Sequence, residues 1–198
     1  MIGNIMNVLE RASTQVRLIN VQEYHRMADV GILGAEERVE LIEGQIWQMA
    51  AKGAGHSAAV TRCDRMLRQV LGDRVLVRLQ DPIQLDKYSE PEPDIAVVAP
   101  DSDDYESNHP TPEQVYLLIE VADTTLKRDL EFRSLLYAKA GIIEYWVLEA
   151  IDRQIHIFRD PSPDGYLSKS VVADGDSISL LAFGDREIAV IELIRPKV

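Results

Sequence analysis

Apolar side chains recur along this chain at two different periods, one typical of helices and one typical of strands. Over residues 56–71 they repeat at spacings of three and four, which predicts an amphipathic helix with one buried face. A second helix is predicted over 124–140, with Asp123 or Thr124 as its cap and Gly141 at its end. Both helices therefore have a face that must pack against another element.

Runs rich in β-branched and aromatic residues predict most of the remaining elements to be strands. A short helix is expected first, over Val21–Asp29. The region 39–49 contains two strand-like runs that meet at Gly44, as in a hairpin. Further strands are predicted at 74–79, 82–85, 94–99, 115–122 and 144–148, and in a tail whose last run is 188–194.

The order of these elements predicts a mixed sheet with helices on its faces, an α/β (α+β) fold. A strand, a helix and a strand follow one another from 115 to 148, which indicates a crossover between parallel strands. The earlier strands are close enough in sequence to pair antiparallel. Residues 1–198 are expected to form a single domain. The acidic loop 100–112 is interpreted as a solvated connection, with a flap over a site as the alternative.

Composition and charge narrow the classes of protein. No apolar run approaches the ~20 residues that span a bilayer, and the start carries no secretion signal, so we expect a cytoplasmic protein. The single cysteine, Cys63, falls on the apolar stripe of its helix and is interpreted as a buried hydrophobe. The net charge of −12 opposes non-specific DNA coating. It leaves room for a nuclease, because a carboxylate site is acidic until metal binds.

Two carboxylates stand where buried strands are otherwise apolar. Glu120 interrupts the apolar run 115–122, where an unpaired charge would cost several kcal/mol. Asp94 begins the other strongly apolar strand, directly after Pro93. Mg²⁺ favours such oxygen ligands, with water and substrate phosphate in its other positions. The alternative is that an internal arginine holds Glu120 and that Asp94 is an ordinary turn residue.

The predicted helix after Glu120 carries a cation on its inward face. Its apolar stripe is about 80° wide at about 100° per residue, and Arg133 lies within it. That stripe consists of Leu126, Leu130, Tyr137 and Ala140. Arg133 is either a structural counter-ion or a group that positions phosphate and water.

The order of several short motifs resembles the Uma family of putative restriction endonucleases, a branch of the PD-(D/E)XK nuclease superfamily. The resemblance covers roughly residues 40–157. It is carried by Pro93-Asp94, IleGluValAla at 119–122, ThrThrLeuLysArgAsp at 124–129, LeuTyrAlaLysAlaGlyIleIleGluTyrTrpVal at 136–147, ValGluLeuIleGluGlyGlnIle at 39–46, His56, and GlnAspProIleGlnLeu at 80–85.

The resemblance implies a restriction-endonuclease-like core with a strand-rich C-terminal extension, in which Asp94 and Glu120 hold Mg²⁺ or Mn²⁺. It adds Glu40 as a further metal-site carboxylate or, alternatively, a surface salt bridge. It adds His56 as a catalytic group or, alternatively, a helix cap. The superfamily lysine two residues after the glutamate is replaced by Ala122, and the lysine that the family carries on the next helix is replaced by Arg133.

The leading hypothesis is metal-dependent hydrolysis of DNA phosphodiester bonds. Asp94 and Glu120 would hold a cation that polarises the scissile phosphate and activates a water, while Arg133 stabilises charge on the phosphoryl oxygens. The alternative is a catalytically silent module that binds nucleic acid or protein, in which Arg133 neutralises Glu120. The strand-rich tail hints at a homodimer.

Overall fold

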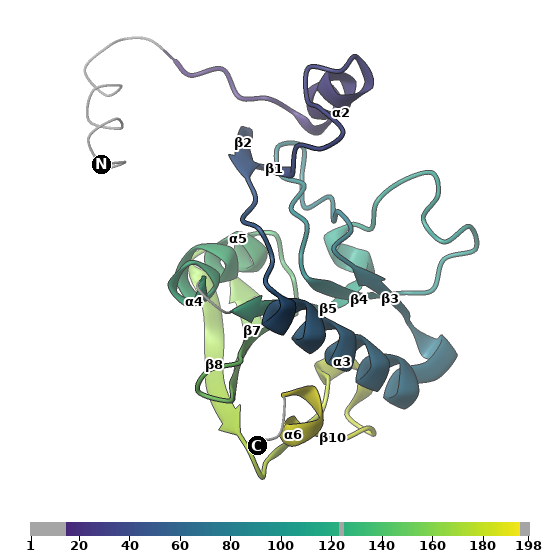
Figure 1. The fold of residues 1–198 in the computed structure, drawn as a ribbon, viewed down its shortest axis with the longest axis vertical. Coiled ribbons are helices and arrows are strands. Elements are labelled where there is room, and N and C mark those ends of the chain that lie inside the picture. The colour runs from purple at the N-terminus through teal and green to yellow at the C-terminus, as the bar shows by residue number, and fades with distance from the viewer. Residues whose placement is uncertain (1–14, 123–124, 195–198) are drawn as a thin grey trace.

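A six-stranded mixed sheet forms the centre of the molecule, with strand order β3-β4-β5-β6-β7-β8 (Figure 1). The computed structural model describes residues 15–122 and 125–194. The sheet strands are β3 (Leu76–Leu79), β4 (Ile95–Val98), β5 (Val115–Ala122), β6 (Glu144–Glu149), β7 (Gln154–Ser162) and β8 (Gly165–Ala173). The strands β5 and β6 are parallel and every other neighbouring pair is antiparallel, which confirms the mixed sheet.

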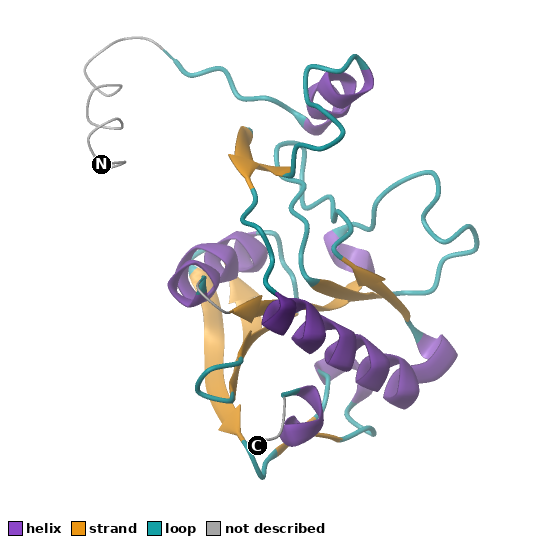
Figure 2. Cartoon of the chain, in the orientation of Figure 1, coloured by secondary structure: helices purple, strands orange, loops and turns teal. Residues whose placement is uncertain are grey.

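Smaller elements surround this sheet (Figure 2). The helices are α2 (Val21–Asp29), α3 (Ala54–Leu71), α4 (Leu126–Arg128), α5 (Ser134–Lys139) and α6 (Val190–Leu193), with a π turn, η3, at Asp129–Arg133. The 3₁₀ turns are η1 (Gly72–Arg74), η2 (Pro112–Gln114) and η4 (Leu181–Phe183). The strands β1 (Val39–Ile42) and β2 (Gln45–Gln48) form the predicted hairpin, and β9 (Ser177–Ile178) pairs with β10 (Ile188–Ala189).

Each face of the sheet carries its own hydrophobic core. One face packs against α3 and α6, through side chains such as Cys63, Leu67 and Leu193. The other face packs against the α4–α5 segment, where Tyr137 and Tyr145 are fully buried. Both faces of β5 are therefore covered by helices, which is why its sequence is apolar at almost every position.

Two sequence predictions about secondary structure need correction, and a third cannot be compared with the structure. The segment 82–85 is not a strand: Ile83 and Gln84 donate their backbone N–H groups to Pro91 and Pro110 in neighbouring loops, so its buried apolar side chains pack without a strand partner. The run 188–194 is a two-residue strand followed by the helix α6. The expected cap at Asp123 or Thr124 lies outside the described residues.

The C-terminal strands are part of the main sheet. The predicted strand-rich C-terminal extension is present, and its strands β7 and β8 continue the central sheet from its β6 edge. The loop 100–112 is more than a solvated connection, because Tyr105 is buried and its hydroxyl donates to the Ala99 carbonyl at 2.9 Å. None of the described helices is long and apolar enough to cross a membrane.

Candidate active site

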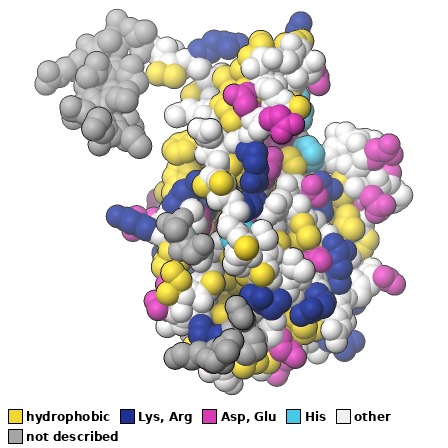
Figure 3. Space-filling model, viewed as in Figure 1, with side chains coloured by type: hydrophobic (Ala, Val, Ile, Leu, Met, Phe, Trp, Pro, Cys, Tyr) yellow, Lys and Arg dark blue, Asp and Glu magenta, His cyan; other side chains and the backbone are white. Residues whose placement is uncertain are grey.

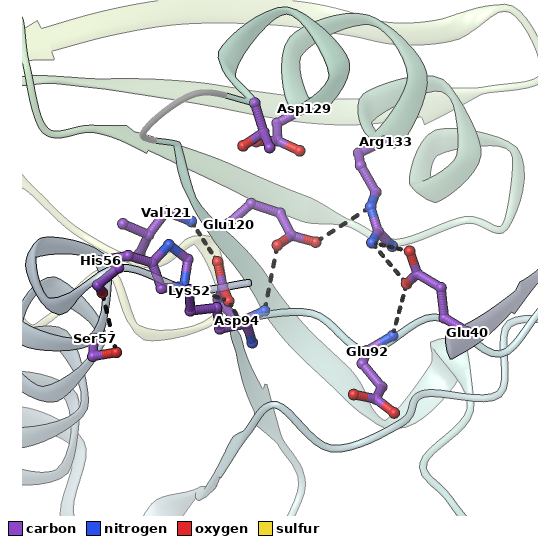
Figure 4. A network of polar contacts seen from close by, with 12 residues as sticks. Glu40, Lys52, His56, Ser57, Glu92, Asp94, Glu120, Val121, Asp129 and Arg133 are labelled. Carbon is purple, nitrogen blue, oxygen red and sulfur yellow. Dashed lines mark hydrogen bonds and ion pairs between the residues drawn. The ribbon is translucent and has the colours of Figure 1, made fainter. Parts of the chain in front are cut away.

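The pairing of β4 with β5 brings Asp94 and Glu120 together. Ile95 lies opposite Ile119 in this antiparallel pair, so the residues just outside that register, Asp94 and Glu120, are neighbours. The Asp94 N–H lies 3.4 Å from Glu120 Oε2, and the Val121 N–H donates to Asp94 Oδ2 at 2.9 Å (Figure 4). Both carboxylates are buried, with 5% and 6% of their surface exposed. The sheet itself therefore fixes their positions.

The free oxygen of Asp94 faces two cationic groups from the segment that begins α3. His56 Nε2 lies 2.9 Å from Asp94 Oδ1, and Lys52 Nζ lies 3.3 Å from the same oxygen. The hydrogen bond to Asp94 raises the pKa of His56. Burial opposes ionisation of Asp94, but the hydrogen bonds from His56 and Val121 outweigh it and lower the pKa of Asp94. The pair is therefore stabilised in its charged form.

His56 does not cap its helix. The helix α3 starts at Ala54, its N-cap is Gly53, and no side chain donates or accepts a capping hydrogen bond there. The imidazole of His56 instead points to Asp94, as Figure 4 shows. This replaces the capping alternative with a contact to the carboxylate pair.

Glu120 is held on its other oxygen by the helical segment packed over the sheet. The Tyr137 hydroxyl donates to Glu120 Oε1 at 2.8 Å, and Arg133 Nε lies 3.7 Å from that oxygen. Burial raises the pKa of Glu120 to about 8, and the nearby Asp94 charge adds to this effect, whereas Arg133 opposes it. Without a bound cation, Glu120 is therefore mostly protonated at neutral pH.

Arg133 has Glu40 as its main partner, not Glu120. Its Nη2 lies 2.7 Å from each oxygen of Glu40, and both side chains are at most 2% exposed. Arg128 contributes a further contact to Glu40 at 3.2 Å, and the Glu92 N–H lies 3.3 Å from it. Glu40 therefore forms a buried salt bridge, and the expectation of a surface salt bridge is wrong.

A π turn points two ionisable side chains of this segment inward. Within Asp129–Arg133 both Asp129 and Arg133 are buried, and the Ser134 hydroxyl donates to the Leu130 carbonyl at 2.6 Å. The Thr125 hydroxyl donates to Asp129 at 2.5 Å. Burial is the main reason why the pKa of Asp129 is raised. Widened helical turns of this kind are frequent at functional sites.

These side chains line one pocket, which we call the carboxylate pocket. It is bounded by Ala50, Lys52, His56, Glu92, Asp94, Glu120, Val121, Thr125, Arg128, Asp129 and Arg133, among others. Glu40 adjoins it through Arg133. Five carboxylates (Glu40, Glu92, Asp94, Glu120 and Asp129) thus face three permanent cations (Lys52, Arg128 and Arg133) and the imidazole of His56. With His56 charged and Glu120 protonated these charges balance, and ionisation of Glu120 leaves one negative charge uncompensated.

The chemistry of these donors is a test of whether a divalent cation fits the pocket. Hard cations such as Mg²⁺ and Mn²⁺ bind carboxylate oxygens, and their charge would favour the ionised form of Glu120. Each ionised carboxylate has about four acceptor positions, so Asp94 and Glu120 can accept their present hydrogen bonds and still offer an oxygen to a metal. The donor set therefore fits an oxygen-liking divalent cation.

Sequence reasoning missed Lys52 and Asp129. Lys52 stands in a glycine-rich stretch before the predicted helix, four residues ahead of His56, and that proximity is the one signal that pointed to it. Asp129 belongs to the motif that carried the family resemblance, but its role depends on the π turn. By contrast Glu90, which precedes Asp94 in the sequence, does not line the pocket, and neither does any residue of the loop 100–112.

The chain is similar to a known protein family and to a solved structure. The family model described as "Putative restriction endonuclease", Uma2, matches residues 21–191. A crystal structure of a putative nuclease belonging to DUF820 from Anabaena variabilis is similar in fold, with a TM-score of 0.67 and 18% sequence identity. The match covers 88% of this chain and 97% of that one. No curated protein matches the chain.

Replacing Arg133 by Met is expected to destabilise the fold by roughly 3–5 kcal/mol, because it leaves the Glu40 charge buried without its partner. Adding Glu40→Gln to that variant should recover a large part of the loss. Urea unfolding of the single and double variants measures this. As a matched control, Lys139→Ala on α5 removes an exposed pair with Glu43 and should change stability by less than ~0.5 kcal/mol. Equal losses in the single and double variants would contradict the pairing.

The stability of the metal-free protein should fall as pH rises from about 5 to about 8. The native pKa of Glu120, about 8, lies above its unfolded value of 4.5, so the native state holds a proton that the unfolded state has lost in this range. Glu120→Gln removes the group that titrates, and with it this dependence on pH. Measured at pH 5, 6, 7 and 8, the free energy of unfolding of the wild type should therefore fall relative to that of the variant. A wild-type free energy of unfolding that stays constant or rises relative to the variant would refute the raised pKa of Glu120.

Proposed function

This chain belongs to the Uma2 family, and from that premise we propose that it is a metal-dependent nuclease that hydrolyses DNA phosphodiester bonds at the carboxylate pocket. The proposal rests above all on the buried pair of Asp94 and Glu120 at adjacent strand ends, in a pocket that is also lined by the carboxylates of Glu92 and Asp129. Keeping acidic groups together in the interior costs stability unless a ligand binds them. The family description supplies the class of substrate.

Asp94 and Glu120 are the residues that would hold Mg²⁺ or Mn²⁺. When bound there, a divalent cation supplies Lewis acidity toward phosphate and lowers the pKa of water. The backbone N–H of Val121 holds one oxygen of Asp94, and His56 orients the other. Glu120 must lose its proton to take part, and the Tyr137 hydroxyl keeps its carboxylate in one orientation.

We assign the role of phosphate-facing cation to Lys52 in preference to Arg133. The guanidinium of Arg133 is committed to both oxygens of Glu40 and cannot lose a proton. The Lys52 ammonium lies in the pocket, 3.3 Å from Asp94, and has no hydrogen-bond partner among the described residues. It is therefore free to donate to a phosphate oxygen or a water. Arg133 and Glu40 then act as positioning residues for Glu120.

The surface beside the pocket supports a nucleic-acid substrate in spite of the net charge. Four arginines lie along α3 and the η1 turn after it: Arg62, Arg65, Arg68 and Arg74. Arg68 pairs with Asp64 and Arg74 with Asp185, so Arg62 and Arg65 contribute most of the net positive charge. Figure 3 shows Lys and Arg side chains over the region where α3 runs. The helix α3 begins at the carboxylate pocket, with Lys52 and His56 near its first turn. Such local basic patches attract phosphates in an otherwise acidic protein.

A catalytically silent binding module remains the second candidate, and one observation favours it. His56 and Lys52 both contact Asp94 Oδ1, so the metal-free pocket partly neutralises itself. Calorimetric titration with Mn²⁺ separates the two functions. Binding that is lost in Glu120→Ala supports the nuclease, whereas no Mn²⁺ binding supports the silent module.

Purified protein is expected to cleave DNA in the presence of Mg²⁺ or Mn²⁺, and Asp94→Asn should lower the rate by at least ~10²-fold because a ligand for the cation is lost. Gel assays with single-stranded, double-stranded and supercoiled DNA measure the rate. The matched control is Glu149→Gln. Glu149 ends the neighbouring strand β6 and contacts His156 at 2.9 Å, but it lies outside the pocket, so its loss should leave cleavage unchanged. Equal cleavage by the Asp94 variant would expose a contaminating nuclease.

Lys52→Gln is expected to lower kcat by about 10²–10³-fold, the loss seen when one donor to a developing charge is removed. Mn²⁺ affinity should not fall, since the change also removes a positive charge beside Asp94. Single-turnover cleavage and calorimetry measure the two quantities. Lys139→Gln, a lysine on the surface of α5, should cleave like the parent. A Lys52 variant with full activity would return the role of phosphate-facing cation to Arg133.

A further inference from the structure

A second group of potential ligands lies outside the carboxylate pocket. His25 on α2, Glu90 in the segment before β4, and His109 in the loop after β4 bring their ligand atoms within 4.8 Å of one another. His25 Nε2 lies 2.6 Å from Glu90 Oε1, and the rings of His25 and His109 meet edge to face at 6.1 Å. None of the three lines the carboxylate pocket. The three residues come from segments distant in sequence, so the fold gathers them.

Two polar atoms of this cluster are buried without a partner. Among the described residues, neither Glu90 Oε2 nor His109 Nδ1 has a hydrogen-bond partner, although Glu90 is only 3% exposed. Buried polar atoms in folded proteins almost always find a partner, because leaving one unsatisfied is costly. A hydrogen bond between His25 and Glu90 leaves both atoms unsatisfied. A cation between the three side chains would satisfy both.

The backbone holds the three segments in place independently of these side chains. The Val21 N–H at the start of α2 donates to Lys87 at 2.9 Å, and the Glu90 N–H donates to Leu41 at 2.7 Å. The loop that carries His109 is tied to the same region, because Gln84 donates its N–H to Pro110 at 3.0 Å. The cluster is therefore pre-organised, and binding a cation needs only small side-chain adjustments.

We propose that His25, Glu90 and His109 form a binding site for Zn²⁺, or for a divalent metal of the same ligand preference. Two imidazoles and one carboxylate are a ligand set that suits zinc, with water in the remaining position of the tetrahedron. Mg²⁺ prefers oxygen ligands alone, so the two sites of the chain differ in their metal. The bound metal would clamp α2 and the loop 100–112 onto the segment before β4.

Titration of Zn²⁺ into the full chain carrying Asp94→Asn tests the site, because that change weakens competing binding in the carboxylate pocket. We expect about one equivalent to bind and the thermal midpoint to rise. His109→Gln and His25→Gln should each weaken binding at least tenfold. His156→Gln is the matched control: it removes a histidine that also contacts a glutamate, Glu149, and should change nothing. Circular dichroism of each metal-free variant checks the fold, and the exposed His25 makes at least one folded variant available.

The absence of a zinc equivalent in the Asp94→Asn chain would overturn the proposal, and so would binding that survives both histidine changes. Hydrogen exchange tests the clamp, because zinc should slow amide exchange in α2 and in the loop 100–112 but not in β5. Exchange rates in α2 and in this loop that are the same with and without zinc would show that the metal does not clamp them. None of these readouts involves DNA cleavage, so the zinc site stands or falls separately from the nuclease function.

Discussion

The need to neutralise buried carboxylates governs the architecture of this site. An uncompensated charge in the interior costs several kcal/mol, so each acidic group needs a proton, a cation or donated hydrogen bonds. Glu40 is balanced by Arg133, Asp94 by His56 and Lys52, and Glu120 by a proton when no metal is present. The strand β1, which carries Glu40, the start of α3, which carries His56, and the α4–α5 segment, which carries Arg133, are therefore joined partly by these charge pairs.

The pairing of the sheet strands brings the carboxylates and their neutralising partners close together. Antiparallel pairing of β4 with β5 lets the Glu120 carboxylate accept from the backbone N–H of Asp94, and the Asp94 carboxylate from that of Val121. Between the parallel strands β5 and β6 the chain passes through the α4–α5 segment, on the face of the sheet opposite to α3. That segment carries Arg133 and Tyr137 down onto Glu120. A carboxylate pair on backbone ladders is rigid, whereas its cations sit on longer side chains that can move when a metal binds. The pocket thus combines fixed anions with adjustable cations.

The parts of the site that sequence could foretell are those fixed by strand patterns. Asp94 and Glu120 stood out because each breaks an apolar run, and Arg133 because it falls on the apolar stripe of its helix. Lys52 could not be found in this way, since its contact depends on the path of a coil between β2 and α3 that has no periodic pattern. The segment 82–85 has the alternating pattern of a strand, but its hydrogen-bond partners lie in loops, which leave no pattern in the sequence. The buried state of Glu40 likewise depends on a contact across 93 residues.

The π turn at Asp129–Arg133 determines in which direction the later side chains of the α4–α5 segment point. A π turn accommodates one residue more than an α-helical turn does, so everything after it is rotated relative to everything before it. In a regular α-helix of the same sequence the later side chains, Tyr137 among them, would be turned by about 100° from their present directions. In related sequences, the length of this short stretch is therefore as informative about the state of the site as the identity of any residue in it.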